Sequence, residues 1–473
     1  MVHLCQRSTV RRPVSLLALL LAGSAVFAVT TGAVEVFIDA TRGAIQKIPI
    51  AVYSFKSAIS VPGQFPADVL KADLRRSLLF DVADLERFGI RAEENSQPGP
   101  EALQKAGEAG LAVQVWGALL PRGSEIVMEG TLFESSRGEV GRKRYVGSTD
   151  VVRYMVHRLA DEIVFHYTGE QGIARSQIAF VSERDGAKEI FVMDYDGYNR
   201  RRLTFDASLN LAPAWSPDRR RLAFVSYRKG NDPRIEELDL ITGARRPLVA
   251  FPGLNITPEW SPSGEELAFA TSKDGNSEIY KVDKYGKRFE RLTDHGAADL
   301  APTWSPTGRE LAFTSDRGGT PQIYLMSADG TNVRPLTYRD QQGSYNTAAA
   351  WSPKGDWIAY VCRDERRILK LCLISPDGQQ WRQLTTGSSN DESPAWSADG
   401  RHVAFSSTRN GRRDIYMINT DGTGLERLTT GGTSNEDPAW SAPRAIRVPW
   451  VPALTSARDL VRSMPADKWR TGE

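Results

Sequence analysis

Six polar side chains occupy the same place in a repeated sequence pattern, each five residues before a Trp-Ser pair. They are Asn210, Asn255, Asp299, Asn346, Asp391 and Asn435. Side-chain oxygens of this kind are ligands that suit Ca²⁺, and they also accept hydrogen bonds from backbone N–H groups in turns. We favour turn capping as the reason why the residue type recurs, with a polar ring at the channel mouth as the alternative; the two can coexist, because a capped turn still shapes the surface that a partner meets. Because closely spaced carboxylates are missing, we expect no bound metal.

Residues suited to catalysis are few. After His3, the histidines are His157, His166, His295 and His402, which are scattered between a predicted helix and loops. The chain has no Gly-x-Ser-x-Gly pentapeptide, the nucleophile motif of α/β hydrolases. A Ser-His-Asp assembly is compatible with the composition, but no motif positions one. We therefore expect a binding protein without a cofactor rather than an enzyme.

The Trp-Ser pairs themselves indicate the scaffold that positions the six polar residues. The pairs begin at Trp215, Trp260, Trp304, Trp351, Trp396 and Trp440, at intervals of 44 to 47 residues. Between them recur an aliphatic segment, an Ile-Tyr-like segment, an Asp-Gly turn and Arg-Leu-Thr. A period in the forties built of strand-sized segments is typical of β-propeller blades. If each pair ends an innermost strand, the six Asn and Asp side chains surround one mouth of the central channel.

The two ends of the repeat region predict how the ring closes. The first aliphatic segment, Ile178–Val181, has no Trp-Ser strand before it, and the last pair, at Trp440, has no aliphatic strand after it. We therefore expect the C-terminal strand to complete the first blade, which leaves no open sheet edge. This predicts a six-bladed β-propeller over residues 177–443, followed by a loosely ordered tail over residues 444–473.

A different organisation precedes the repeats. Three arginines followed by an uncharged apolar run predict a secretory signal peptide over residues 1–28, with cleavage as late as residue 33; an uncleaved membrane anchor is the alternative. Residues 34–172 mix strand and helix patterns, with helices expected over Pro66–Phe80 and Thr149–Tyr167. The sequence thus predicts a two-domain protein, a small N-terminal α/β domain followed by the propeller.

Net charge and cysteine content add two expectations. The net charge is only +2, so no sequence-wide basic field points to nucleic acid. Cys362 and Cys372 fall on two adjacent strands of one predicted blade, and an oxidising compartment would permit a cross-strand disulfide. Because Cys372 replaces the Tyr of other repeats, we favour the interpretation that the two cysteines are small apolar strand residues without a bond.

Two further motifs point to a family. The segments ADLRRSLLFD (Ala72–Asp81) and DYDGYNRRRLT (Asp194–Thr204), together with six NxxPxWSPxG-like repeats after a signal peptide, resemble the TolB family. Members of that family are periplasmic propeller proteins of the Tol-Pal system of Gram-negative bacteria. The resemblance covers roughly Val34 to Ser441. It implies binding and not chemistry: a Pal-like peptidoglycan-associated lipoprotein held at the channel mouth, and a TolA-like inner-membrane protein contacted by the mature N-terminus, in support of outer-membrane integrity and cell division.

The resemblance also implies site residues. Carried over by motif, the Pal-facing positions are Asn210, Leu211, Leu254, Asn255, Ile256, Asp299, Leu300, Asn346, Asp391 and Asn435, and the TolA-facing switch is Glu35, Val36, Phe37, Ile38 and Asp39. Some relatives carry His where this chain has Leu254, so we expect contacts at that blade to differ. The implied protein is a periplasmic monomer that reaches the envelope membranes only through its partners. The alternatives are an exported propeller with another ligand and a prolyl-oligopeptidase-related hydrolase.

Overall fold

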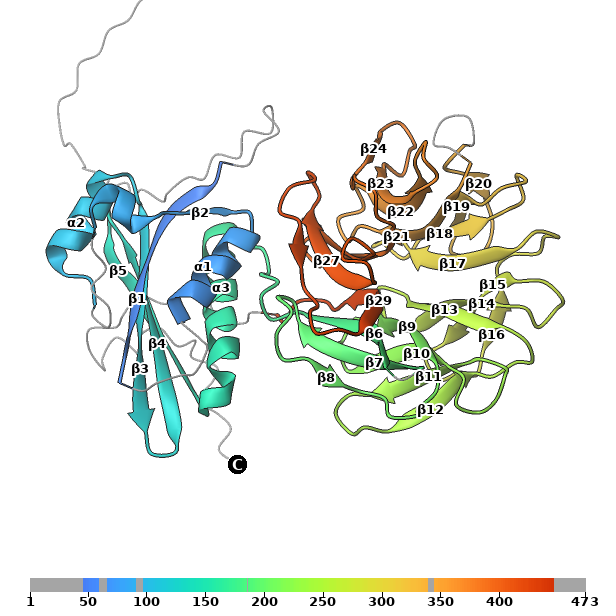
Figure 1. Ribbon diagram of the computed structural model, residues 1–473, viewed down its shortest axis with the longest axis horizontal. Coiled ribbons are helices and arrows are strands. Elements are labelled where there is room, and N and C mark those ends of the chain that lie inside the picture. The colour runs from blue at the N-terminus through green and yellow to red at the C-terminus, as the bar shows by residue number, and fades with distance from the viewer. Residues whose placement is uncertain (1–45, 59–65, 91–96, 185, 339–343, 446–473) are drawn as a thin grey trace, which may run out of the picture. The chain divides into compact units, whose positions relative to one another are not determined.

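The computed structural model describes residues 46–58, 66–90, 97–184, 186–338 and 344–445. The predicted signal peptide, the predicted switch Glu35–Asp39 and the tail beyond Ala445 lie outside these residues. In the described part, the chain forms an α/β domain followed by a six-bladed β-propeller, which confirms the predicted fold class (Figure 1). The described residues from Lys47 onward belong to one compact unit.

The α/β domain is built on a five-stranded sheet of order β2-β1-β3-β4-β5. Strand β1 (Ile48–Ser57) runs parallel to β2 (Phe80–Val82) and β3 (Val113–Arg122), and β4 (Glu125–Glu134) and β5 (Gly138–Gly147) continue the sheet antiparallel. The helical elements are α1 (Pro66–Arg76), η1 (Leu85–Phe88), α2 (Pro100–Glu108), η2 (Thr149–Val151) and α3 (Val152–Thr168). Alternate residues of β1 face two cores: Ile50 packs with α1 and α3, and Tyr53 packs with η1 and α2.

The two predicted helices are present, with one shorter than expected. Helix α1 ends at Arg76 rather than Phe80, because Leu78 takes a positive φ of 61° and turns the chain so that Phe80 can pair with β1. Helix α3 ends at Thr168, one residue beyond the expected Tyr167, and Gly169 caps it in the left-handed region with φ 70°. Strands β2 and β5 and helix α2 were not expected from the sequence pattern.

The propeller consists of six four-stranded antiparallel sheets. Their innermost strands are β9 (Asn210–Trp215), β13 (Asn255–Trp260), β17 (Asp299–Trp304), β21 (Asn346–Trp351), β25 (Asp391–Trp396) and β29 (Ser434–Trp440). The second strands are β6 (Gln177–Arg184), β10 (Arg221–Ser226), β14 (Glu266–Thr271), β18 (Glu310–Ser315), β22 (Ile358–Arg363) and β26 (His402–Ser407). The third strands are β7 (Ala187–Asp194), β11 (Arg234–Asp239), β15 (Glu278–Asp283), β19 (Gln322–Ser327), β23 (Leu369–Ile374) and β27 (Asp414–Asn419). The outer strands are short: β8 (Arg201–Arg202), β12 (Arg245–Val249), β16 (Phe289–Arg291), β20 (Arg334–Pro335), β24 (Trp381–Gln383) and β28 (Glu426–Arg427).

The ring closes as the repeat count predicts. Strand β29 pairs with β6, so that Trp440 lies opposite Ile178 and the first blade combines the last strand of the repeat region with the first three (Figure 1). Closure by the chain's own C-terminal strand pairs the inner edge of the first blade's sheet.

The Trp side chains at the ends of the inner strands join neighbouring blades. The indole N–H of Trp304 donates to the carbonyl of Glu259 at 3.3 Å, and that of Trp396 donates to the carbonyl of Ala350 at 2.8 Å. In both cases the acceptor lies on the inner strand of the preceding blade. The repeated Trp is therefore a packing and registering residue, as its size suggests.

The favoured interpretation of the cysteine pair is wrong. Cys362 in β22 and Cys372 in β23 form a disulfide. The two residues are diagonal neighbours in the antiparallel pair, since Cys362 lies opposite Lys370 and Cys372 lies opposite Tyr360. Cys372 stands where three other blades carry Tyr280, Tyr324 and Tyr416, and a comparison of the repeats does not reveal whether the two cysteines are bonded.

Candidate functional site

The six Asn and Asp residues stand at the start of the inner strands, but their side chains are not exposed. Asn435 is 3% exposed, and Asn210, Asn255, Asp299, Asn346 and Asp391 are 0% exposed. The structure thus brings the six residues to the same end of six neighbouring strands, as the repeat predicts, and covers their polar groups. Direct contact of these side chains with a partner would require the strand ends to open.

Three of the amides bind to the third strand of the preceding blade. Asn346 donates to Gln322 at 2.8 Å, and Asn210 donates to Glu189 at 3.0 Å. The Thr of the repeated Arg-Leu-Thr sequence donates to the same acceptor, as Thr337 does to Gln322 at 2.7 Å. The third amide is that of Asn435, which reaches Asp414 at 3.3 Å. The residue type recurs because it completes a buried hydrogen-bond network between blades.

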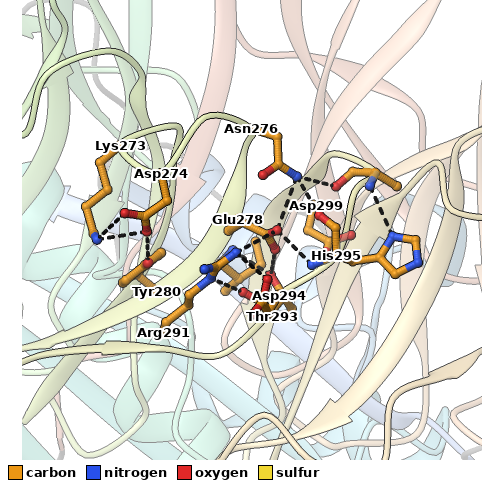
Figure 2. A network of polar contacts seen from close by, with 12 residues as sticks. Lys273, Asp274, Asn276, Glu278, Tyr280, Arg291, Thr293, Asp294, His295 and Asp299 are labelled. Atoms are coloured by element: carbon orange, nitrogen blue, oxygen red, sulfur yellow. Dashed lines mark hydrogen bonds and ion pairs between the residues drawn. The ribbon is translucent and has the colours of Figure 1, made fainter.

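The same network is extended at the third and fourth blades (Figure 2). Thr293 donates to the fully buried Glu278 at 2.6 Å, and Arg291 and the backbone N–H of His295 reach the other carboxylate oxygen at 3.1 and 2.8 Å. Asp299, at the start of the next inner strand, lies beside this group of side chains. Because the buried carboxylate of Glu278 is already surrounded by hydrogen-bond donors, its role is to stabilise the fold.

The two aspartates of the set each have an arginine partner. Arg317 donates to Asp299 at 2.7 Å, and Arg409 donates to both oxygens of Asp391 at 2.8 Å. Each arginine lies two residues beyond the second strand of its own blade. Burial raises the pKa of Asp299, and the Arg317 guanidinium opposes that shift. Each carboxylate thus has its charge compensated by an arginine of its own blade.

Beyond these residues the inner strands bend into the channel. Two residues after each of the six Asn or Asp residues, the backbone has a positive φ of 47° to 54°; these residues are Ala212, Thr257, Ala301, Ala348, Ser393 and Asp437. The pairing with the second strand shifts register at this point in every blade. Such bulges re-aim the chain, and here they expose backbone and small side chains to the channel.

The channel contains a cavity of about 490 Å³ lined mainly by alanines and prolines of the inner strands. Glu259 and Asp437 are the two acidic residues of its lining. Burial raises the pKa of Glu259 to about 7. Burial, together with the neighbouring Glu436, also raises the pKa of Asp437, whose carboxylate accepts a 2.9 Å hydrogen bond from Ser393. Sequence analysis missed both carboxyls, although Glu259 departs from the Ala or Thr found before the Trp in the other blades.

Exposed apolar side chains lie on the loops that lead into the inner strands. Phe205 is 71% exposed, Tyr338 45%, Leu254 41% and Leu209 38%. We call these four residues the entry-loop surface. The predicted site residues Leu211, Ile256 and Leu300 follow on the inner strands and are half-buried. Because all inner strands begin at the same end of the ring, these side chains gather on one face of the propeller.

A second polar cluster was not predicted. Asp73 of α1 lies 2.8 Å from Nδ1 of His157 in α3, and Asp196, in the turn after β7, lies 3.5 Å from Nε2 of the same ring. Tyr195 donates to Asp73 at 2.5 Å, and Arg153 binds Asp196. All five side chains are at most 7% exposed. The quoted motifs contained Asp73, Tyr195 and Asp196, so the family signal marks a contact between the α/β domain and the first blade.

The residue types of this cluster could bind a metal ion, but the charged side chains around them form a buried ion-pair network. The potential ligand atoms of Asp73, His157 and Asp196 lie within 4.8 Å of one another. Arg153 already neutralises Asp196, and a divalent cation placed beside that guanidinium would be repelled. Burial disfavours protonation of His157, but Asp73 and Asp196 outweigh it and raise its pKa. A protonated His157 between two carboxylates balances the buried charge without a metal.

Two predictions concern other parts of the chain. The switch residues Glu35, Val36, Phe37, Ile38 and Asp39 lie outside the described residues. Within the described ranges, none of the helices has the length and apolarity needed to cross a membrane.

Comparisons with known proteins agree on one family. A family model described as "TolB beta propeller domain" matches residues 165–443, and one described as "TolB amino-terminal domain" matches residues 36–133. "Tol-Pal system protein TolB" of Desulfosudis oleivorans is 34% identical over 194 residues, covering 39% of this chain and 44% of that protein. The protein of the same name from Paramagnetospirillum magneticum is 33% identical over 249 residues, covering 48% and 52%. The chain spans about half the length of the curated relatives it matches.

Among solved structures, the crystal structure of TolB from Acinetobacter baumannii superposes with a TM-score of 0.71 at 26% sequence identity. The superposition covers 84% of this chain and 97% of that one. It therefore includes both the α/β domain and the propeller.

Proposed function

The chain belongs to the TolB family, and from that premise we propose that it is the periplasmic, non-catalytic protein-binding component of a Tol-Pal system. It docks a Pal-like lipoprotein on the propeller face where the inner strands begin. It couples to a TolA-like inner-membrane protein through Glu35–Asp39. In this role it acts as an exported monomer and supports outer-membrane integrity and cell division.

The observation that carries the docking site is the entry-loop surface. Exposed Phe205, Leu209, Leu254 and Tyr338 lie on loops at the end of the ring where the inner strands begin. Exposed apolar groups on one face are typical of protein-binding surfaces. The half-buried Leu211, Ile256 and Leu300 extend this surface toward the channel.

The six Asn and Asp residues have a different role in this proposal. Since Asn210, Asn255, Asp299, Asn346, Asp391 and Asn435 are buried, they fix the positions of the strand ends and loops that the partner contacts. Their hydrogen bonds hold neighbouring blades together. The partner then contacts the apolar surface of the strand ends and loops rather than the polar groups of the six Asn and Asp side chains.

Affinity isolation from an envelope extract tests the proposed function. The mature chain should retain a Pal-like lipoprotein and a TolA-like protein. A variant that lacks the mature residues through Ala40 should lose the TolA-like protein and keep the lipoprotein, because the two sites lie on separate segments. A matched variant with five alanines at Glu35–Asp39 controls for chain length. Isolation of a different ligand by the intact chain, with neither partner, would contradict the proposal.

A further inference from the structure

Arg219 occupies a turn position that four of the other five repeats give to glycine; the sixth repeat has Arg444 there. The turn after the Trp-Ser pair contains Gly264, Gly308, Gly355 and Gly400 at this place, with φ between 66° and 77°. Arg219 adopts the same conformation, with φ 62°. A side chain other than Gly is strained in the left-handed region, because its Cβ lies too close to the backbone. The second blade therefore accepts backbone strain in order to place an arginine here.

The guanidinium of Arg219 is also poorly satisfied. Its Nε and Nη1 atoms are buried and have no hydrogen-bond acceptor among the residues that the structure describes. Buried donors of a charged group are costly to leave without an acceptor, because the desolvation of the group is not compensated. Nothing in the fold of the turn requires this arrangement, since glycine serves in the equivalent blades.

The groups around Arg219 leave positive charge uncompensated. Asp161 of α3 accepts from Arg175 at 2.7 Å, Arg175 donates to the carbonyl of Arg444 at 2.9 Å, and Arg444 donates to Tyr154 at 3.1 Å. Burial and then the neighbouring Arg444 lower the pKa of Arg219 to about 10, and Arg175 acts in the same direction. Three guanidinium groups thus share one carboxylate, which is already bound to Arg175.

We propose that Arg219, Arg175 and Arg444, with the hydroxyl of Tyr154, form a binding site for an oxyanion of the phosphate or carboxylate type. An oxyanion supplies the acceptors that Arg219 lacks and compensates the excess positive charge. The site lies between helix α3 and the turn after the first strand of the second blade. It is distinct from the entry-loop surface, which lies at the other end of the inner strands.

The test uses inorganic phosphate as the probe, at constant ionic strength, with thermal unfolding as the readout. If the ligand is a free anion, the wild-type melting temperature should rise by about 2–4 °C as phosphate reaches saturation; if a carboxylate of the chain fills the site, the same rise should appear in a chain ending at Ala445. Arg219→Gly should lose this rise yet remain folded, because it restores the residue of the other blades. Arg220→Gly is the matched control, since it removes one positive charge from the exposed neighbouring residue. Equal rises in wild type and Arg219→Gly would overturn the proposal.

Two sources of the anion have the required chemistry, and a shortened chain distinguishes them. The sequence beyond Arg444 contains Asp459, Asp467 and Glu473, so a carboxylate of the same chain has the required chemistry. A response of the full chain to phosphate supports a free anion. A response only of a chain ending at Ala445 supports a site filled by its own carboxylate. No response in either chain overturns the proposal.

Discussion

Arg317 donates a 2.7 Å hydrogen bond to the buried carboxylate of Asp299, and so joins the loop after β18 to the start of β17. The carboxylate of Asp299 at the channel mouth is therefore part of the buried structure of the blade and is not exposed for a partner to bind. Replacing it changes the stability of the fold before it changes any contact with a partner.

Substitution at Asp299 should reveal this structural role. Asp299→Asn should cost about 1 kcal/mol, because Asn already stands at this position in four blades and Arg317 can still be hydrated. Asp299→Lys should cost about 3–5 kcal/mol, because it buries a second cation beside Arg317. Urea unfolding measures both. Asp294→Lys is the control, since the Asp294 side chain is 84% exposed; equal losses at the two positions would contradict the assignment.

His157 predicts a loss of stability in the alkaline range. Its folded-state pKa is raised above the ordinary value of 6.5, so its stabilising contribution is complete below pH 6.5 and is lost as pH rises through the folded pKa. His157→Phe should be less stable by about 3 kcal/mol at pH 6, and its stability should change less between pH 6.5 and 9. Guanidinium unfolding across that range provides the measurement. His295→Phe, at an exposed histidine, should keep the wild-type profile; identical profiles for wild type and His157→Phe would refute this role.

We expect Glu259 to cause a second pH dependence of the stability, in a lower pH range than that of His157. Its folded-state pKa of about 7 exceeds the ordinary value of 4.5, so the folded chain holds the proton more tightly than the unfolded chain. The contribution is complete below pH 4.5 and is lost as pH rises through 7. Glu259→Gln should remove a decline on the order of 1 kcal/mol between pH 5 and 8, because channel water moderates the effect. Glu265→Gln is the control, because the wild-type Glu265 side chain is 63% exposed, and this variant should retain the decline in stability. If the decline disappeared in both variants, it could not be assigned to the channel carboxyl of Glu259.

The architecture could be predicted because it depends on repetition. One Trp at a constant interval marks one inner strand, and the count of aliphatic strands against Trp-Ser pairs fixes the closure between β29 and β6. These inferences need only the order of the strands. The exposure of Asn210 or Asp391 depends instead on side chains of the preceding blade and of the loops, such as Glu189 and Arg409.

Contacts between segments that are distant in the sequence could not be predicted from a single sequence. His157 meets Asp73 across 84 residues, and no local pattern links them. The disulfide between Cys362 and Cys372 likewise depends on the diagonal offset of two strands rather than on their spacing. Arg219 is a residue that the repeats do reveal, because it stands where four other turns carry glycine.

The central claim is that a partner docks on the entry-loop surface, and titration of a purified Pal-like lipoprotein tests it most directly. Leu254→Asp should weaken binding at least tenfold, because it places a charge in the apolar contact and costs 1.4 kcal/mol or more. Ile241→Asp is the matched control: Ile241 is 69% exposed and lies in the turn between β11 and β12, at the opposite end of the blade. Both variants should unfold at the wild-type temperature. Tenfold weaker binding by Leu254→Asp alone is the predicted result, and wild-type affinity in Leu254→Asp would contradict the account.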